Sequence, residues 1–317
     1  MHTRIGIPPV KKHSTPPSNL RTARWLSPES YWVPSHLVLS AWLEHGPFAE
    51  WVIAATRPRV LVELGTHNGY SYFAFCQAIK RLGLDTRAYA VDTWEGDDHA
   101  GFYSDEIYDL VQKVNQDGYA EFSTLIRGYF DDALASIDDG SVDLLHIDGR
   151  HAYEDVKHDY ESWIPKLSDR AVVLFHDVAV RERGFGVWKL WKEIAAPGRS
   201  FSFSHGNGLG VLAHGAASPQ PVLDFIRSSE QNGDRMREDY GSLGFEMTRR
   251  WYDEAERRNA LDALALAQGR VLELEQAAAE LERIRASGSW RVALALSKAG
   301  RLAPASLRAR LRGRSTL

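Results

Sequence analysis

The sequence predicts an α/β protein: a doubly wound, mostly parallel sheet followed by a long C-terminal helix. Two observations predict the sheet. Between residues 59 and 215, short apolar runs rich in β-branched residues alternate with stretches that have the 3.6-residue period of a helix. Parallel strands need crossovers and are buried on both faces, so this alternation favours helix layers on either side of one Rossmann-like sheet. A third observation predicts the helix, because apolar residues recur at spacings of four and three over residues 251–286.

Length and composition set the class of protein. At about 150 residues per domain, 317 residues indicate one large body with an appendage. With 44% hydrophobic and 25% charged residues the chain can bury a core, and a net charge of -4 argues against a nucleic-acid partner. The single cysteine, Cys76, excludes an intrachain disulfide framework and a multi-cysteine zinc site, and it favours a cytoplasmic location. We expect neither a transmembrane helix nor a secretory signal, since no apolar run is long enough.

The N-terminal part is expected to be an arm followed by a cover. Residues 1–30 contain five prolines, which disfavour regular structure, so we expect a flexible Pro-rich arm. Residues 35–56 have helical spacing that Gly46 and Pro47 divide into two helices. These helices would form the N-terminal cover of a main domain spanning residues 31–215.

Within that domain, each strand is followed by a helix. The expected strands are residues 59–64, 87–92, 122–127, 141–148 and 171–177. The expected helices are residues 69–83, 104–116, 129–137, 152–167 and 186–196. Residues 199–205 and 208–214 flank a Gly-Asn turn signal, which predicts a terminal antiparallel hairpin.

Beyond the sheet, three segments are expected. Residues 216–250 would be a polar linker with a short helix over 221–230, and residues 251–286 a long helix. The helix has an apolar seam suited either to a coiled coil or to packing on its own domain; the seam consists of Ala260, Leu264, Ala267, Val271, Leu274, Ala278 and Leu281. Residues 287–317 contain seven basic and no acidic residues. Such a tail suits anionic lipid at a membrane surface, a polyanion or an acidic partner, and a solvated tail is the alternative.

The first strand leads into a glycine turn that suits a cofactor. In an open α/β sheet, ligands bind beyond the carboxyl ends of the strands, and Gly65 and Gly69 let the backbone turn tightly there. Glu63 would repel a pyrophosphate but could bind an ammonium group. Asp92, at the end of the second strand, is placed to accept hydrogen bonds from two ribose hydroxyls. The alternative is a plain turn with a helix-capping acid.

The fourth and fifth strands end in residues that suit a cation. Asp148 closes one strand, and His176 and Asp177 close the next, so these side chains are expected at one lip of the sheet as ligands of a divalent cation. His151 is the candidate general base, with helix capping as its alternative. We expect His146, which alternates with Asp148, to be packed in the sheet rather than to be a ligand.

Four segments together resemble the class I S-adenosylmethionine (SAM)-dependent methyltransferases, in the branch of macrocin O-methyltransferase and the cephalosporin-hydroxylase-like proteins, especially members found with bacterial glycosyltransferases. The segments are AVDTWEGDDHAGFYSDEIYDLV, DLLHIDGRHAYEDVKHDYESWIPKL, VVLFHDVAVRERGFGVWKLWKEI and HGNGLGVL. The likeness covers residues 35–215, and this chain has His67 where many methyltransferases have a third glycine.

The resemblance implies a role for each cofactor residue. It implies that Glu63 faces the methionine ammonium of SAM. The residues implied around the rest of SAM are Gly65, Gly69 and Ser71 at the methionine and ribose, Asp92 and Trp94 at the ribose and adenine side, and Phe130 and Asp131 at the adenine.

The expected function is therefore methyl transfer from SAM to an oxygen, with a sugar hydroxyl of a glycan or glycosylated metabolite as acceptor and a divalent cation such as Mg²⁺ or Mn²⁺ assisting. The C-terminal helix would join a second copy or a glycosyltransferase partner. Two alternatives stay open at this stage. One is a non-catalytic scaffold on a vestigial methyltransferase fold, and the other is a nicotinamide-dependent oxidoreductase, which Glu63 and the missing Gly-x-Gly-x-x-Gly disfavour.

Overall fold

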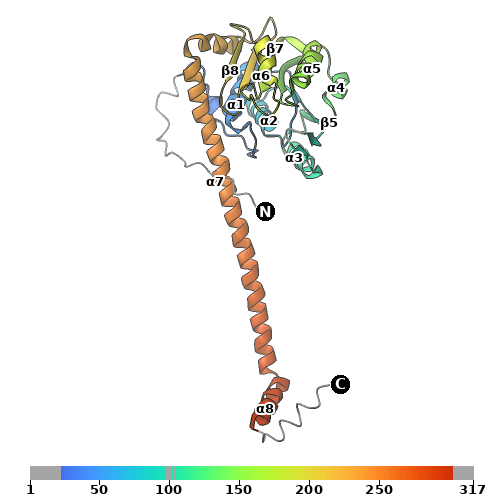
Figure 1. Cartoon of the computed structure of the whole chain (residues 1–317), viewed down its shortest axis with the longest axis vertical. Coiled ribbons are helices and arrows are strands. Elements are labelled where there is room, and N and C mark those ends of the chain that lie inside the picture. The colour runs from blue at the N-terminus through green and yellow to red at the C-terminus, as the bar shows by residue number, and fades with distance from the viewer. Residues whose placement is uncertain (1–22, 98–100, 103, 303–317) are drawn as a thin grey trace. The chain divides into compact units, whose positions relative to one another are not determined.

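The computed structural model describes residues 23–97, 101–102 and 104–302, and the chain divides into two compact units, Met1–Tyr252 and Asp253–Leu317. Helices and strands alternate through the first unit, and helix alone continues into the second (Figure 1). Within the described residues, none of the helices combines the length and the apolarity needed to cross a membrane.

A seven-stranded sheet forms the centre of the first unit, with strand order β5-β2-β1-β6-β7-β9-β8. The strands are β1 (Val60–Leu64), β2 (Arg87–Asp92), β5 (Ser123–Arg127), β6 (Val142–Ile147), β7 (Leu167–His176), β8 (Ser200–Phe203) and β9 (Leu209–Ala213). The first five pair in parallel, whereas β9 runs antiparallel to both β7 and β8. The predicted parallel sheet and its terminal antiparallel hairpin are therefore confirmed. A separate two-stranded ribbon joins β3 (Gly96–Asp97) to β4 (Gly101–Phe102).

Alternation along each strand divides the core between the two faces of the sheet. On β1, Leu61 belongs to one buried cluster, and Val60 and Val62 belong to the other. The first cluster includes residues of α1 (Gly46–Thr56), α2 (Tyr70–Leu82) and α3 (Asp105–Gly118), and the second includes residues of α5 (Tyr153–Trp163) and α6 (Val187–Ile194). The sheet is therefore covered on both faces, as the alternation of strands and helices predicts.

Short helical turns complete the first unit. They are η2 (Pro28–Tyr31), η3 (Leu43–His45), α4 (Phe130–Ala133), η4 (Leu134–Ser136) and η5 (Ile164–Lys166). Of the two helices expected over residues 35–56, the structure forms the second, α1, whereas residues 35–42 are not helical and only the short turn η3 precedes α1. Gly46 and Pro47 form the first turn of α1, where proline is favoured, so they begin a helix rather than divide one.

The expected arm ends earlier than residue 30. Residues 1–22 of it lie outside the described residues, but Trp25 and Ser30 are buried. Trp25 Nε1 donates to the carboxylate of Asp239 at 3.0 Å, and the hydroxyl of Tyr240 donates to the backbone oxygen of Trp25 at 3.0 Å. The proline content of residues 1–30 could not predict this contact, because Trp25 makes it with a segment more than 200 residues away in the sequence.

Helix α7 spans Gln220–Ala286, so most of the segment expected as a linker is helical. The reason is tertiary packing. Met236, Tyr240, Gly244 and Met247 are buried at helical spacing in the first unit, and their burial outweighs the low helix propensity of the glycines and polar residues around them.

In the second unit, the described residues form the remainder of α7, from Asp253, and α8 (Gly288–Leu302). No residue from Asp253 to Ala299 is buried. Ser287 separates the two helices, and its hydroxyl accepts a hydrogen bond from the backbone N–H of Trp290, which caps the start of α8.

Candidate active site

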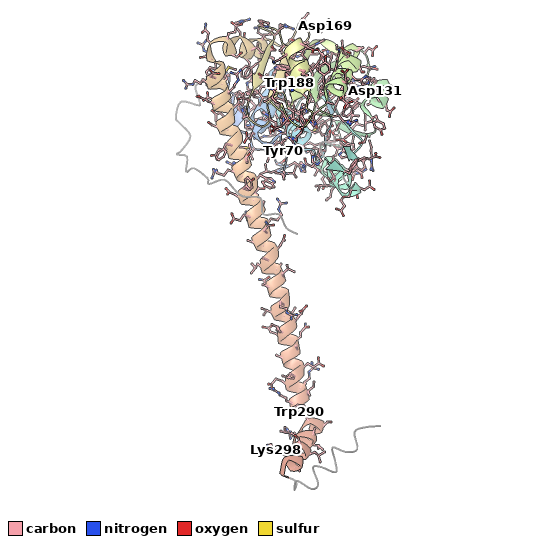
Figure 2. The ribbon with its side chains drawn as sticks, in the orientation of Figure 1. Tyr70, Asp131, Asp169, Trp188, Trp290 and Lys298 are labelled. Atoms are coloured by element: carbon pink, nitrogen blue, oxygen red, sulfur yellow. The ribbon has the colours of Figure 1, made fainter. Side chains whose placement is uncertain are left out.

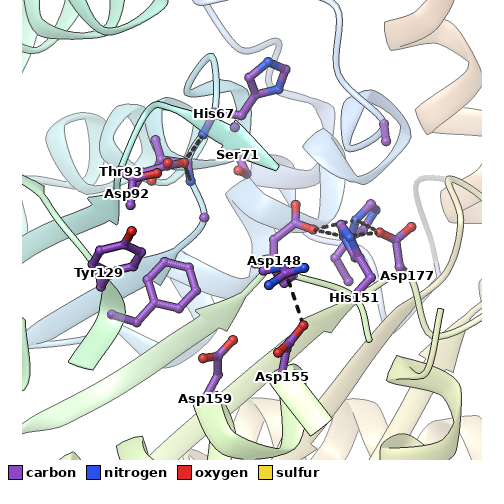
Figure 3. A pocket seen from close by; sticks show the side chains of 18 of the residues that line it. His67, Ser71, Asp92, Thr93, Tyr129, Asp148, His151, Asp155, Asp159 and Asp177 are labelled. Carbon is purple, nitrogen blue, oxygen red and sulfur yellow. Dashed lines mark hydrogen bonds and ion pairs between the residues drawn. The ribbon is translucent and has the colours of Figure 1, made fainter. Parts of the chain in front are cut away.

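A cavity of about 450 Å³ opens at the carboxyl ends of β1, β2, β5, β6 and β7 (Figure 3). The turn after β1, the end of β2, the start of α4, the turn after β6 and the end of β7 line it, together with Ser40 and Ala41 of the N-terminal cover. This is the position expected for a ligand in an open parallel sheet.

The glycine turn between β1 and α2 is required by the packing of the chain itself. Gly65 has φ +88°, and a Cβ there would lie 2.1 Å from the backbone oxygen of Asp148. Gly69 has φ +82°, and a Cβ there would lie 2.6 Å from the ring of Phe73. Gly65 lines the cavity, whereas Gly69 is not among the lining residues. His67 also has a positive φ, +48°, an uncommon conformation for a residue other than glycine.

Asp92 holds this turn against the end of β2. Its Oδ2 accepts hydrogen bonds from the backbone N–H groups of Thr66 and His67, both at 2.8 Å, as the dashed lines in Figure 3 show for His67. Its Oδ1 accepts a third from the N–H of Trp94 at 2.7 Å. Asp92 also lines the cavity, so the same carboxylate shapes the turn and faces a ligand.

Two residues expected at the cofactor lie behind the cavity wall. Glu63 is fully buried with a carboxylate oxygen 2.7 Å from Nδ1 of His146, and burial raises the pKa of its carboxyl. Trp94 is buried, and its Nε1 donates to the backbone oxygen of His67 at 2.8 Å. Neither is among the lining residues, whereas Ser71, Phe130 and Asp131 are. His146 is packed in the sheet, as expected.

A cluster of two carboxylates and one imidazole lies at the other end of the cavity. Nε2 of His151 lies 2.8 Å from Oδ2 of Asp177 and 3.6 Å from Oδ1 of Asp148 (Figure 3). One possible ligand atom from each of the three residues lies within 4.8 Å of the others. Asp177 is held at φ +61°, and its Oδ1 is buried with no hydrogen-bond partner among the described residues. A strained backbone and an unpaired buried oxygen are both typical of functional sites.

The electrostatics of the cluster favour charged forms. Burial opposes ionisation of the Asp148 and Asp177 carboxyls, but the neighbouring imidazoles of His176 and His151 outweigh it and lower the pKa of both. Burial likewise lowers the pKa of His151, and hydrogen bonds to the two carboxylates overcome this and raise it to about 9. These groups therefore form a network of mutually stabilised charges.

His176 belongs to the same cluster, but both of its ring nitrogens are engaged by the protein. Nδ1 lies 3.1 Å from Oδ1 of Asp148, and Nε2 lies 3.0 Å from the backbone oxygen of Gly206. Nε2 of His45 lies 3.0 Å from the same oxygen. The structure therefore groups His151, rather than His176, with the two aspartates as a possible cation site.

The sequence analysis did not predict that acidic residues of α5 line one wall of the cavity. Asp155, His158 and Asp159 all line it, and His158 Nε2 lies 2.9 Å from a carboxylate oxygen of Asp131. Burial raises the pKa of Asp159 to about 7. The signal was present in the sequence, because Asp155 and Asp159 lie one helical turn apart just after Asp148.

The loop after β7 borders the cluster. The ring of Phe185 stacks on that of His151 with centroids 4.4 Å apart, and the N–H of Gly186 donates to the backbone oxygen of His151 at 2.7 Å. A Cβ at Gly186 would lie 2.4 Å from the backbone nitrogen of Tyr153, so glycine is required for this close approach.

A family model matches the segment that contains most of the cavity residues. Residues 62–178 match the family model described as "Methyltransferase domain". The protein "Uncharacterized protein y4gI" of Sinorhizobium fredii (strain NBRC 101917 / NGR234) is 56% identical over 189 residues, which cover 60% of this chain. They cover 21% of that protein, so the chain spans about a fifth of the length of this curated relative.

Similar solved structures include the O-methyltransferase TomG from Streptomyces achromogenes in complex with SAM. Its identity is 20% over 56% of this chain and 82% of that one, with a TM-score of 0.40. A methyltransferase from Geobacter sulfurreducens is 17% identical over 56% of this chain and 79% of that one, with a TM-score of 0.41.

Proposed function

We propose that the protein transfers a methyl group from SAM to an oxygen atom. The observation that supports this most directly is that the cavity residues from Gly65 to Asp177 all lie in the segment that matches the methyltransferase-domain model. The cavity combines a glycine turn with a hydroxyl-accepting carboxylate at one end and a charged acid–imidazole cluster at the other. Donor and acceptor would therefore bind at opposite ends of one cavity.

The donor end suits the polar and aromatic parts of SAM. Asp92 offers an acceptor for a ribose hydroxyl, and the ring of Phe130 offers an apolar surface for a purine. A Cβ at Gly149 would lie 2.4 Å from the Phe130 ring, so glycine at this position allows the ring to approach the turn after β6. We propose for Phe130 and Asp131 the role at the adenine that the family resemblance implies.

The acceptor end fits a divalent cation by the chemistry of its donors. The carboxylates of Asp148 and Asp177 and the imidazole of His151 suit Mg²⁺, Mn²⁺ or a similar ion, and the unpaired Oδ1 of Asp177 is available for it. When bound, such an ion would lower the pKa of an acceptor hydroxyl.

The residues of the chain position the acceptor and receive its proton. Because methyl transfer is an in-line displacement, most of the catalytic effect would come from holding the acceptor oxygen against the methyl group. His151 is the proposed general base in its neutral form, and its contact with Asp177 and its stacking on Phe185 fix the ring. Because the two carboxylates raise its pKa to about 9, the neutral form requires high pH or a cation on those carboxylates, whose charge would oppose protonation of the imidazole. One nitrogen cannot both bind a cation and accept the proton, so these two roles of His151 Nε2 are alternatives.

The proposed acceptor is a sugar hydroxyl of a glycan or a glycosylated metabolite. Support for this choice is the resemblance of the motifs around Asp148, Asp177 and Gly206 to the sugar-modifying branch of the methyltransferases. The same resemblance supports a glycosyltransferase as a partner.

Labelled methyl transfer tests the proposal. The purified chain is incubated with methyl-labelled SAM and with extracted cell-surface glycans or nucleotide sugars, with and without a chelator. We expect label in the acceptor fraction, its loss in the chelator and its return with Mg²⁺ or Mn²⁺. Absence of SAM binding by isothermal titration would refute the proposal and favour a non-catalytic scaffold.

His151→Ala separates the two roles of the imidazole. If His151 is the general base, His151→Ala should lower turnover by about 10²–10⁴-fold. Turnover should recover in part at higher pH, and the affinity for Mn²⁺ should stay unchanged. As a cation ligand, its loss would weaken Mn²⁺ binding in a titration without acceptor. Lys113→Ala, on the exposed surface of α3, is the matched control.

A further inference from the structure

The second unit presents an apolar seam that the rest of the described chain leaves exposed. In α7, Leu264, Val271, Leu274 and Leu281 have exposed fractions between 48% and 58%. They follow one another at intervals of seven, three and seven residues, with Ala260, Ala267 and Ala278 completing the 4-3 pattern. Residues at this spacing lie along one stripe of a helix and form the contact of coiled coils.

A helical segment as long as residues 253–286 depends on the burial of an apolar face. Most helical stability in proteins comes from burying an apolar face, and an isolated helix in water is marginal. From Asp253 to Ala286, no side chain is buried by the described chain. No described residue supplies this contact, which favours another molecule as its source.

The order of residues in the seam favours two parallel strands. With Leu264, Val271 and Ala278 at the a positions, Ala260, Ala267, Leu274 and Leu281 occupy the d positions. The central pair, β-branched Val271 at a and Leu274 at d, is the combination that favours a parallel dimer.

Charges beside the seam match those of a second copy. In this register Arg270 is a g residue and Glu275 is the e residue of the next heptad, which are the positions that meet across a parallel dimer. The other g-to-e pairs are Glu256 with Leu261, Ala263 with Gln268 and Ala277 with Glu282, and none of the three places like charges together. Arg270 bonds Glu273 within its own helix at 2.7 Å, but both side chains are more than 60% exposed, so this ion pair competes weakly. In an antiparallel pair that places Val271 opposite Leu274, Arg270 and Glu275 would not meet.

From these observations we infer that residues 260–281 bind the same segment of a second copy as a parallel, in-register, two-stranded coiled coil. The proposal is independent of the proposed catalytic function, because it rests on the second unit alone.

Sedimentation equilibrium of the full chain tests the association. We expect a dimer for the wild type. Leu274→Asp, in the seam, should shift the equilibrium to monomer with a dissociation constant at least 100-fold weaker. Leu266→Asp is the matched control, because Leu266 is 77% exposed at a c position outside the seam, and it should leave the dimer intact. A monomeric wild type, or equal effects of the two substitutions, would overturn the proposal.

A charge exchange tests the orientation. Arg270→Glu places two glutamates against each other in a parallel dimer, and Glu275→Arg places two arginines, so each variant alone should dimerise at least tenfold more weakly. When the two variants are mixed, both cross-pairs become attractive, and a heterodimer should form preferentially, as native mass spectrometry can measure. If mixing yields no more than a statistical fraction of heterodimer, the parallel register is refuted. Both changes lie on exposed side chains, so the first unit should stay folded. Thermal denaturation of each variant without SAM can verify that the melting temperature of the first unit is unchanged.

Discussion

The Asp92 carboxylate accepts hydrogen bonds from three backbone amides, and this number limits what it can offer a ligand. A carboxylate has about four lone-pair sites, two on each oxygen. The N–H groups of Thr66 and His67 use both sites of Oδ2, and Trp94 uses one of Oδ1. One site therefore remains for a ribose hydroxyl, where the sequence suggested two.

We predict that Asp92→Ala affects both binding and stability. Loss of the remaining acceptor and of the ordered turn should weaken SAM binding by about 2–4 kcal/mol. Because three backbone donors lose their partner, the melting temperature should also fall. Isothermal titration and thermal denaturation measure the two effects, with the exposed Asp117→Ala as control. An unchanged SAM dissociation constant would contradict the role of Asp92.

Glu50 is a buried acid on α1, outside the cavity. Gln77 Nε2 donates to its Oε1 at 2.6 Å, and its Oε2 has no hydrogen-bond partner among the described residues. Burial is the largest effect on this group and raises its pKa from 4.5 to about 8. The folded protein therefore keeps this proton to higher pH than the unfolded chain.

We predict that Glu50→Gln makes the protein more stable at pH 8. Between pH 4.5 and 8 the unfolded chain binds fewer protons at this site than the folded protein, so the free energy of unfolding falls as pH rises through that window. The amide has no such dependence, and the gain at pH 8 should be about 1–3 kcal/mol. Urea denaturation at pH 5 and pH 8 measures it, with the exposed Glu121→Gln as control. An equal effect at the two pH values would show that Glu50 is ionised in the folded state.

At the site, the sequence predicted where the residues lie better than it predicted their hydrogen-bond partners. Asp148, His176 and Asp177 do meet at one lip of the sheet, because adjacent parallel strands end there. The sequence does not show that the backbone oxygen of Gly206, in the β8–β9 turn, contacts Nε2 of His176. This contact depends on the return of a distant hairpin to the centre of the sheet.

Among the elements, α7 shows how one helix can be governed by different forces along its length. Gly244 lies where the helix packs on the N-terminal cover, and a Cβ there would lie 2.2 Å from the backbone oxygen of Glu44. Gly269 lies in the exposed part, and a Cβ there would meet nothing within 4 Å. Figure 2 shows side chains of α8 at Trp290 and Lys298, in the basic segment whose expected binding to anionic lipid or an acidic partner stays a prediction. Residues 303–317 of that segment lie outside the described residues.

We predict opposite effects for the same substitution at these two glycines. Gly269→Ala should stabilise the helix by up to about 1 kcal/mol, because alanine has the higher helix propensity. Gly244→Ala should destabilise the protein by about 1–3 kcal/mol, because the helix must move away from Glu44. Circular dichroism during thermal denaturation measures both. A stabilising Gly244→Ala would show that α7 does not pack closely at this point.

For the whole molecule, the first unit was more predictable than its boundaries. The apolar periods of strands and helices predicted the sheet and both helix layers, because these patterns are local in the sequence. The ends of the units depend on long-range contacts, such as that of Trp25 with Asp239 and the burial of Met247. A boundary near residue 245 would cut through the packed part of α7.

We therefore predict that truncation after Tyr252, and not near residue 245, leaves a folded, cofactor-binding body. Tyr252 ends the first compact unit, and the cavity lies entirely within it. The truncated chain should melt cooperatively and bind SAM with a dissociation constant within about twofold of the full chain, since no cavity residue is removed. It should also be monomeric, because the seam from Ala260 to Leu281 is absent. A second truncation after Gly244 removes the buried Met247 and should lower the melting temperature. Loss of SAM binding in the longer truncation, with the fold intact by circular dichroism, would mean that the second unit contributes to the site.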